Sequence, residues 1–155
     1  MNLHVERKSP TTLVITRSFA APPERVFAAH TDPAIVKRWM LGPDGWSMPV
    51  CELDARPGGK MRMEWKNDEN GASFSLTGEY QVVEAPHRIV HTERMHLPDP
   101  TPENRVETRF EKDGRGTRMT MTMTVDDPAT MEAMIASGMT DGMEKSFTRL
   151  EPALA

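Results

Sequence analysis

The alternation of apolar and polar positions along the chain predicts a structure built mainly from β-strands. Residues 11–19 are rich in β-branched side chains and form the first predicted strand. From Trp46 onward apolar residues recur at every second position, as Met61, Met63 and Trp65 do between charged neighbours. Together with the Gly- and Pro-rich turns, this pattern predicts six further strands, at residues 46–54, 60–66, 74–82, 88–96, 106–110 and 118–125.

Three helices are predicted from proline positions, capping residues and helical spacing. Pro23 lies in the first turn of a short helix, and Asp32 caps a second short helix that begins at Pro33. Pro128 begins a final helix that extends to about Leu150. Its apolar and glycine positions form one broad stripe, namely Met131, Met134, Ile135, Gly138, Met139, Gly142, Met143, Phe147 and Leu150.

These elements predict an α+β fold with a curved sheet of seven antiparallel strands. One face of the sheet is apolar and needs a cover, and the final helix is the one element long enough to provide it. A helix of about twenty residues is about 30 Å long, which suffices to cross a curved sheet. The two short helices close one end. Since a single helix seldom fills the space beneath a curved sheet, we expect a cavity between the long C-terminal helix and the sheet.

Length and charge narrow the class of protein. A chain of 155 residues fits a single domain, 1–155. The net charge of −4 argues against nucleic acid as a partner, because nucleic-acid-binding domains usually present a basic face. No stretch approaches the ~20 apolar residues of a membrane span, and the N-terminal residues lack the apolar run of a secretory signal. We therefore expect a cytoplasmic protein, as a monomer or weak homodimer.

Patterns for catalysis and metal binding are missing from the sequence. Cys51 is the single cysteine, which excludes an internal disulfide and a cysteine-based zinc site, and no motif supplies the base that a nucleophilic thiol needs. Residues 57–60 resemble a phosphate loop superficially but precede a strand, so they predict a turn. Glu64, Glu79 and Glu107 fall on predicted outer faces. We expect no catalytic residue, no metal and no cofactor.

Methionine is unusually frequent, with thirteen residues, and several of these face the space between the sheet and the final helix. Methionine packs irregular cores, and it also lines adaptable binding surfaces. Most of the inward residues should be core and a minority should contact a ligand. The candidate ligand-binding residues share this inward orientation and are Trp39, Met61, Met63, Trp65, Phe74, Tyr80, His91, Met119, Met121, Met123, Met139 and Met143.

The orientation of His91 is left open by the sequence. His91 shares a strand face with Glu93 and Met95, so the three could form a polar spot inside an apolar cavity. In the alternative, this face points to solvent and Val90 points inward. His87 and His91 lie about 13 Å apart along an extended strand, too far to bind one metal together.

Gly138 and Gly142 are spaced one helical turn apart in the final helix. Each costs about 1 kcal/mol of helix propensity relative to alanine, which favours a spatial role. The glycines either let the helix approach the sheet or leave volume for a ligand.

Several segments together resemble the AHSA1-like proteins of the START/Bet v 1-like (SRPBCC) superfamily. The resemblance covers nearly the whole chain. One departure is Gly142-Met143, where the family often has Gly-Trp; the smaller side chain would enlarge or soften the pocket. The matching segments are residues 17–27, Thr31-Asp32-Pro33 with Trp39, residues 54–59, 78–80, 85–90, 116–121 and 142–150.

The resemblance implies a helix-grip fold with a ligand cavity between the long helix and the sheet, but it implies no single activity. Our leading hypothesis is non-enzymatic binding of a small apolar molecule. A chaperone partner, through an Hsp90-type co-chaperone or ATPase-activator role, is the alternative that the family name suggests. A third hypothesis is an enzyme acting on a polyketide-like substrate, in which His91 and Tyr80 would perform acid/base chemistry.

Overall fold

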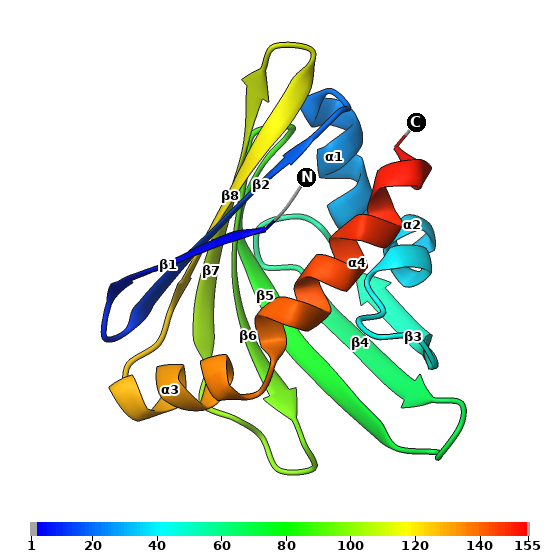
Figure 1. Ribbon diagram of the computed structural model, residues 1–155, viewed down its shortest axis with the longest axis vertical. Coiled ribbons are helices and arrows are strands. Elements are labelled where there is room, and N and C mark those ends of the chain that lie inside the picture. Colours follow the sequence, from blue (N-terminus) through cyan, green and yellow to red (C-terminus); the bar gives the residue numbers. More distant parts are fainter. Residues whose placement is uncertain (1–2, 155) are drawn as a thin grey trace.

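A curved antiparallel sheet forms the centre of the molecule, and the C-terminal helix crosses one of its faces (Figure 1). The computed structural model describes residues 3–154. The strands have the spatial order β1-β2-β8-β7-β6-β5-β4-β3. Their bounds are β1 (His4–Ser9), β2 (Thr12–Phe19), β3 (Trp46–Leu53), β4 (Lys60–Asn67), β5 (Ser73–Glu84), β6 (Arg88–His96), β7 (Asn104–Asp113) and β8 (Gly116–Thr124).

Four helices accompany the sheet in the described part of the chain: α1 (Pro23–Thr31), α2 (Pro33–Trp39), α3 (Pro128–Ala136) and α4 (Met139–Ala153). The predicted starts of the two short helices are confirmed. Pro23 occupies the first turn of α1, and the Asp32 side chain accepts a hydrogen bond from the Ala34 amide at 3.0 Å. Helices α1 and α2 lie beside the C-terminal half of α4, and α3 lies at the other end of the sheet (Figure 1).

The predicted count of seven strands is wrong by one. The additional strand, β1, is an edge strand that pairs with β2, and all but its last residue are exposed. An exposed edge strand has no buried face and therefore no apolar alternation. The absence of this pattern is why the sequence did not reveal it.

The final helix is also not continuous. It is broken at Ser137 and Gly138, where Gly138 adopts φ +80° and becomes the N-cap of α4. This left-handed conformation costs glycine little, so the residue allows the chain to turn between α3 and α4. The overall architecture is the α+β helix-grip fold that was expected.

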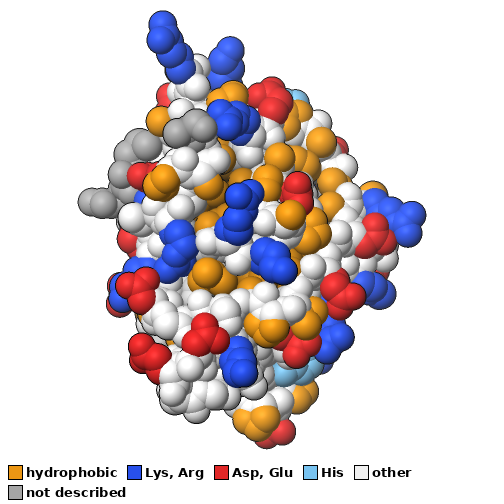
Figure 2. All heavy atoms as spheres, turned by 90° about the vertical axis from the view of Figure 1, so that its right-hand side faces the viewer, with side chains coloured by type: hydrophobic (Ala, Val, Ile, Leu, Met, Phe, Trp, Pro, Cys, Tyr) orange, Lys and Arg blue, Asp and Glu red, His pale blue; other side chains and the backbone are white. Residues whose placement is uncertain are grey.

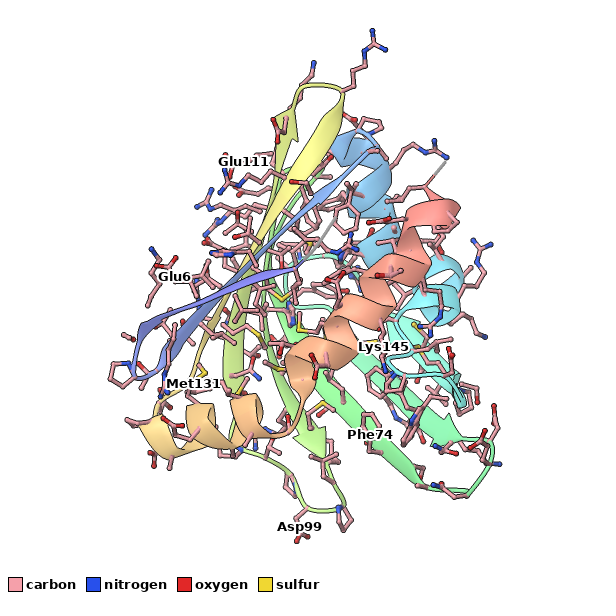
Figure 3. All side chains as sticks on the ribbon, in the orientation of Figure 1. Glu6, Phe74, Asp99, Glu111, Met131 and Lys145 are labelled. Carbon is pink, nitrogen blue, oxygen red and sulfur yellow. The ribbon has the colours of Figure 1, made fainter. Side chains whose placement is uncertain are left out.

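Two groups of buried side chains lie between the sheet and the helices. The larger one includes Phe19, Val26, Trp39, Phe110 and Phe147 and lies under α1, α2 and the C-terminal half of α4. The smaller one lies towards α3 and consists of Leu13, Ile15, Val106, Met123, Val125 and Met131. In Figure 3, Met131 lies between α3 and the strands. Met121 and Met143 pack against both groups and so lie between them.

Candidate ligand-binding site

The register of the central strands brings a row of side chains together on the inner face, the face that α4 crosses. Tyr80 on β5 pairs with His91 on β6, His91 pairs with Val106 on β7, and Val106 pairs with Met123 on β8. Directly paired residues in a sheet point to the same side. Because Tyr80, Val106 and Met123 belong to the buried groups, His91 points inward with them.

The next row on the same face contains Gly78, Glu93 and Asn104, which are paired in that order across β5, β6 and β7. Gly78 has a packing reason to lack a side chain. A Cβ atom there would lie 2.3 Å from the Thr92 carbonyl oxygen and 2.9 Å from the Met61 side chain. Glycine therefore allows close packing of the backbone beside Glu93.

His91, Glu93 and Asn104 form a polar set within this apolar face. The His91 Nε2 atom lies 2.7 Å from a Glu93 carboxylate oxygen. The two side chains are only 14% and 16% exposed. Two buried atoms of the set, His91 Nδ1 and Asn104 Oδ1, have no hydrogen-bond partner within residues 3–154. Buried polar atoms are nearly always hydrogen-bonded. Each of these two atoms could therefore form a hydrogen bond with a bound molecule.

The question of which face His91 occupies is thus settled in favour of the inner face. The alternative had Val90 pointing inward instead. Val90 is 1% exposed, but it belongs to neither of the two buried groups. A β-bulge between Tyr80 and Val82 shifts the register of β5, so that Tyr80 and Val83 both face inward although three positions separate them.

The predicted site residues divide by their burial. Five of them remain only partly buried although they face the interior: Phe74, His91, Met121, Met139 and Met143. Phe74 lies on β5, below and to the right of the N-terminal half of α4 in the view of Figure 3. The others are buried, and they are Trp39, Met61, Met63, Trp65, Tyr80, Met119 and Met123.

Several of the buried residues hold the structure together at positions distant from the polar set. The Trp39 indole donates to the Ala29 carbonyl at 2.9 Å and stacks against Phe147. The Trp65 indole donates to the Met40 carbonyl at 2.8 Å, and its ring stacks against Phe74 at 4.9 Å between centroids. These contacts make Trp39 a core residue and place the Trp65–Phe74 stack near the β3–β4 side of the sheet.

Helix α4 is fixed over the sheet mainly by its C-terminal half. Its buried residues are Ser146, Phe147 and Leu150. The Ser146 hydroxyl accepts a hydrogen bond from the Gly42 amide at 2.8 Å, and the Arg149 guanidinium donates to the Gly42 carbonyl at 3.0 Å. The N-terminal half carries Met139 and Met143, which stay partly buried.

Arg17 provides a charged attachment for the same helix. It lies on β2 with a 1% exposed side chain, and its guanidinium contacts Glu144 at 3.3 Å and Glu151 at 2.7 Å. The guanidinium also lies over the rings of Phe19 and Phe147. Burial raises the pKa of Glu151, but the hydrogen bond and charge of Arg17 outweigh that effect and hold it below its usual value. The ion pairs satisfy the buried cation and fix the position of α4.

The outer faces carry the charged residues that the sequence places there. Glu64 contacts Arg62, Glu79 contacts Lys60 and Glu107 contacts Arg88. A hollow of about 270 Å³ opens on the outer face of β5 and β6, lined mainly by polar and charged residues such as Thr77, Glu79 and Arg94. It lies on the opposite side of the sheet from α4. On the side of the molecule shown in Figure 2, hydrophobic side chains are interspersed with lysine and arginine.

Cys51 and Tyr80 both face an environment that disfavours their charged forms. Burial raises the pKa of the Cys51 thiol, so the thiol is kept protonated rather than activated. Burial also raises the pKa of Tyr80 strongly. Tyr80 can therefore serve as a neutral ring or hydrogen-bonding group but not readily as a base.

Sequence reasoning missed Asn104 and did not include Glu93 among the candidate residues. A signal for Asn104 was present, since it continues the alternation of Val106, Thr108 and Phe110 backward by two positions. All four residues are buried. A polar residue at an inward position is uncommon, so this pattern marks Asn104 as a candidate ligand-binding residue.

A helix that could cross a membrane would need to be longer and more apolar than any in the described residues 3–154.

The fold and its inner face define a helix-grip protein with one helix over a curved sheet. Residues 20–155 match the family model described as "Activator of Hsp90 ATPase homolog 1-like protein". The chain belongs to this AHSA1-like family, as its resemblance to the START/Bet v 1-like (SRPBCC) superfamily predicted.

Solved structures share this fold over nearly the entire chain. A protein from Rhodobacter sphaeroides is 30% identical, with a TM-score of 0.93 over 99% of this chain and 98% of its own. A protein from Nitrosomonas europaea is 25% identical, with a TM-score of 0.82 and 96% coverage of both chains. An AHSA1-like protein from Aeromonas hydrophila is 22% identical, with a TM-score of 0.70 over 90% of this chain and 93% of its own. No curated protein matches the sequence.

Proposed function

We propose that this protein binds a small, mostly apolar molecule between α4 and the inner face of the sheet, without catalysing a reaction on it. The observation that carries the proposal is the incomplete burial of Met121, Met139 and Met143. These side chains face the interior from the sheet and the helix, where a tightly packed core would bury them fully. A bound apolar molecule would cover them.

The geometry of α4 supports the same location. A Cβ atom added at Gly142 would meet nothing within 4 Å, so no neighbouring side chain or backbone requires glycine at this position. Met143 follows Gly142 directly, packs against both buried groups and stays only partly buried. Of the two roles considered for this glycine, close approach to the sheet is therefore disfavoured.

Methyl NMR of methionine-labelled protein would test the proposal. Decanoic acid, cholesterol and 2-methylnaphthalene would each be titrated into the protein, and native mass spectrometry of gently purified protein would detect a co-purifying molecule. We expect at least one probe to shift the methyl signals of Met121, Met139 and Met143. Met48, which is buried at 4% exposure on β3, provides the control signal that should stay in place.

Failure of all three probes to shift any of these signals, with no co-purifying molecule, would contradict the proposal. Equal shifts at Met48 and Met143 would also contradict it, because they would indicate a general change in the protein rather than binding under α4.

A second candidate function is a co-chaperone-like role, and it rests on the description of the family. The experiment that distinguishes it is an ATPase assay with a bacterial Hsp90-type chaperone. Stimulation that increases with the concentration of this protein would favour the co-chaperone role. An unchanged ATPase rate at saturating protein would leave ligand binding as the function.

A further inference from the structure

The polar set formed by His91, Glu93 and Asn104 has a definite hydrogen-bonding character. The Glu93 carboxylate accepts a hydrogen bond from His91 Nε2 at 2.7 Å. A neutral imidazole that donates through Nε2 carries its lone pair on Nδ1. In the neutral ring His91 Nδ1 is an acceptor, and Asn104 Oδ1 is a second one.

The two acceptors belong to the same region of the inner face. Asn104 pairs with Glu93, and His91 lies two positions before Glu93 on the same strand. His91 and Asn104 are thus diagonal neighbours on adjacent strands, a separation of about 7 Å in a typical sheet. Within residues 3–154, neither acceptor atom has a donor, and both are buried.

This region also adjoins the apolar side chains under the N-terminal half of α4. Val106, the direct partner of His91, belongs to the smaller buried group, against which Met121, Met139 and Met143 pack. Figure 3 shows sulfur atoms gathered between the helices and the sheet on this side of the molecule. Val106 therefore connects the polar set to the group of side chains against which these methionines pack.

We infer that the ligand is an apolar molecule that carries a hydroxyl group, and that this group donates a hydrogen bond to His91 or Asn104. The inference rests on the proposed function and specifies its ligand class. A purely apolar molecule would leave both buried acceptors unpaired, which is costly.

A carboxylate ligand is disfavoured by the charge of the polar set. An ionised carboxylate has no donor for the two acceptors and would lie near the Glu93 carboxylate, where like charges repel. Arg17 also lies on the inner face, but Glu144 and Glu151 already occupy its guanidinium. We therefore expect the site to prefer an alcohol or a phenol to a fatty acid of similar size.

Three probes of almost the same shape separate these ligand classes: 2-naphthol, 2-methylnaphthalene and 2-naphthoic acid. Affinities would be measured at pH 7 by the methyl shifts of Met121, Met139 and Met143. One additional buried hydrogen bond corresponds to roughly tenfold in affinity. We expect 2-naphthol to bind about tenfold more tightly than 2-methylnaphthalene, and 2-naphthoate to bind most weakly.

Two variants assign the preference to the polar set. His91→Phe should remove most of the tenfold advantage of 2-naphthol and leave the affinity for 2-methylnaphthalene nearly unchanged. Glu93→Gln keeps an acceptor for His91 Nε2 but removes the charge, so it should retain the preference for 2-naphthol and improve binding of 2-naphthoate. His96→Phe is the matched control, because His96 lies on the same strand with its ring bonded to Thr77 on the outer face.

The outcomes separate the two proposals. If 2-methylnaphthalene binds and 2-naphthol binds no more tightly, or if 2-naphthoate binds best, the hydroxyl preference is overturned while the proposed function stands. If none of the three naphthalene probes binds, the hydroxyl preference is overturned, whereas the proposed function is overturned only if decanoic acid and cholesterol also fail and no molecule co-purifies. If His91→Phe does not fold, the order of the three wild-type affinities and the Glu93→Gln result still decide the question.

Discussion

His30 is a buried histidine enclosed by aromatic rings. Its ring centroid lies 5.0 Å from that of Trp39, 5.1 Å from that of Phe110 and 6.1 Å from that of Phe147. Its Nδ1 donates to the Val26 carbonyl at 2.7 Å, and its buried Nε2 has no partner within residues 3–154. Burial lowers the pKa of His30 from 6.5 to about 4. The neutral ring is therefore part of the folded core.

This lowered pKa predicts a loss of stability in mild acid. The unfolded chain binds a proton at His30 near pH 6.5, whereas the folded chain does so only near pH 4, so the free energy of unfolding falls as the pH drops through this interval. Between pH 7 and pH 5 the expected loss from His30 is about 2 kcal/mol. Urea unfolding at the two pH values measures it.

The His30→Phe variant should lose less stability over this interval than the wild type, by about the same 2 kcal/mol. The comparison cancels other groups, such as Glu107, whose pKa is lowered by its hydrogen bond to Arg88 and which therefore also loses stabilisation in acid. His87 is exposed, and His87→Phe should behave as the wild type does. Equal losses in the wild type and His30→Phe would refute the assigned role of His30.

At the residue scale, the sequence could predict inward positions wherever the alternation was regular. Met119, Met121 and Met123 were correctly placed on the inner face. It could not orient His91, because Ile89 and Val90 are adjacent and both buried, so the alternation of β6 is ambiguous. The β-bulge at Tyr80 and Val82 added a register shift that sequence periodicity does not reveal.

At the scale of elements, the two glycines near the start of α4 have different roles. Gly138 adopts φ +80° and ends the run of helix from α3, whereas Gly142 lies inside α4 with open space around it. The sequence showed both at helical spacing and therefore predicted one continuous helix. Backbone conformation distinguishes them, and spacing alone does not.

This difference predicts opposite effects of the same substitution. Gly142→Ala should raise the free energy of unfolding by up to about 1 kcal/mol, because alanine favours the helix and its Cβ meets no neighbour. Gly138→Ala should lower it by about 1–2 kcal/mol, because an L-residue is strained in the left-handed conformation. Chemical unfolding of both variants measures the two changes. Stabilisation by Gly138→Ala, or destabilisation by Gly142→Ala, would contradict the assigned roles.

At the scale of the whole molecule, α4 is attached unevenly to the sheet. The Arg17–Glu151 ion pair, the hydrogen bonds to Gly42 and the packing of Phe147 and Leu150 fix its C-terminal half, whereas its N-terminal half is attached through Glu144, which contacts Arg17 and the Leu3 amide. Its N-terminal half lies between the two buried groups, with the half-buried Met139 and Met143 facing the same region as the polar set. The fold could be predicted from alternation and resemblance, but this unevenness could not, because it arises from contacts between segments far apart in the sequence.

The unevenness can be tested by placing a larger side chain at Met143, which packs against both buried groups. If free volume surrounds Met143, the indole of Met143→Trp should occupy it, so the free energy of unfolding should hold or rise. The affinity for 2-methylnaphthalene should fall, because the ring and the probe would compete for the same space. Thermal melts and the methyl titration measure the two effects.

Met131→Trp is the matched control for a packed position. Met131 is 0% exposed in the smaller buried group, and overpacking there should cost roughly 1–3 kcal/mol. A similar loss of stability in Met143→Trp, with unchanged affinity for 2-methylnaphthalene, would mean that Met143 belongs to solid core. The proposed site would then have to be rejected at this end of α4, since the same free volume that accepts an indole is what a ligand requires.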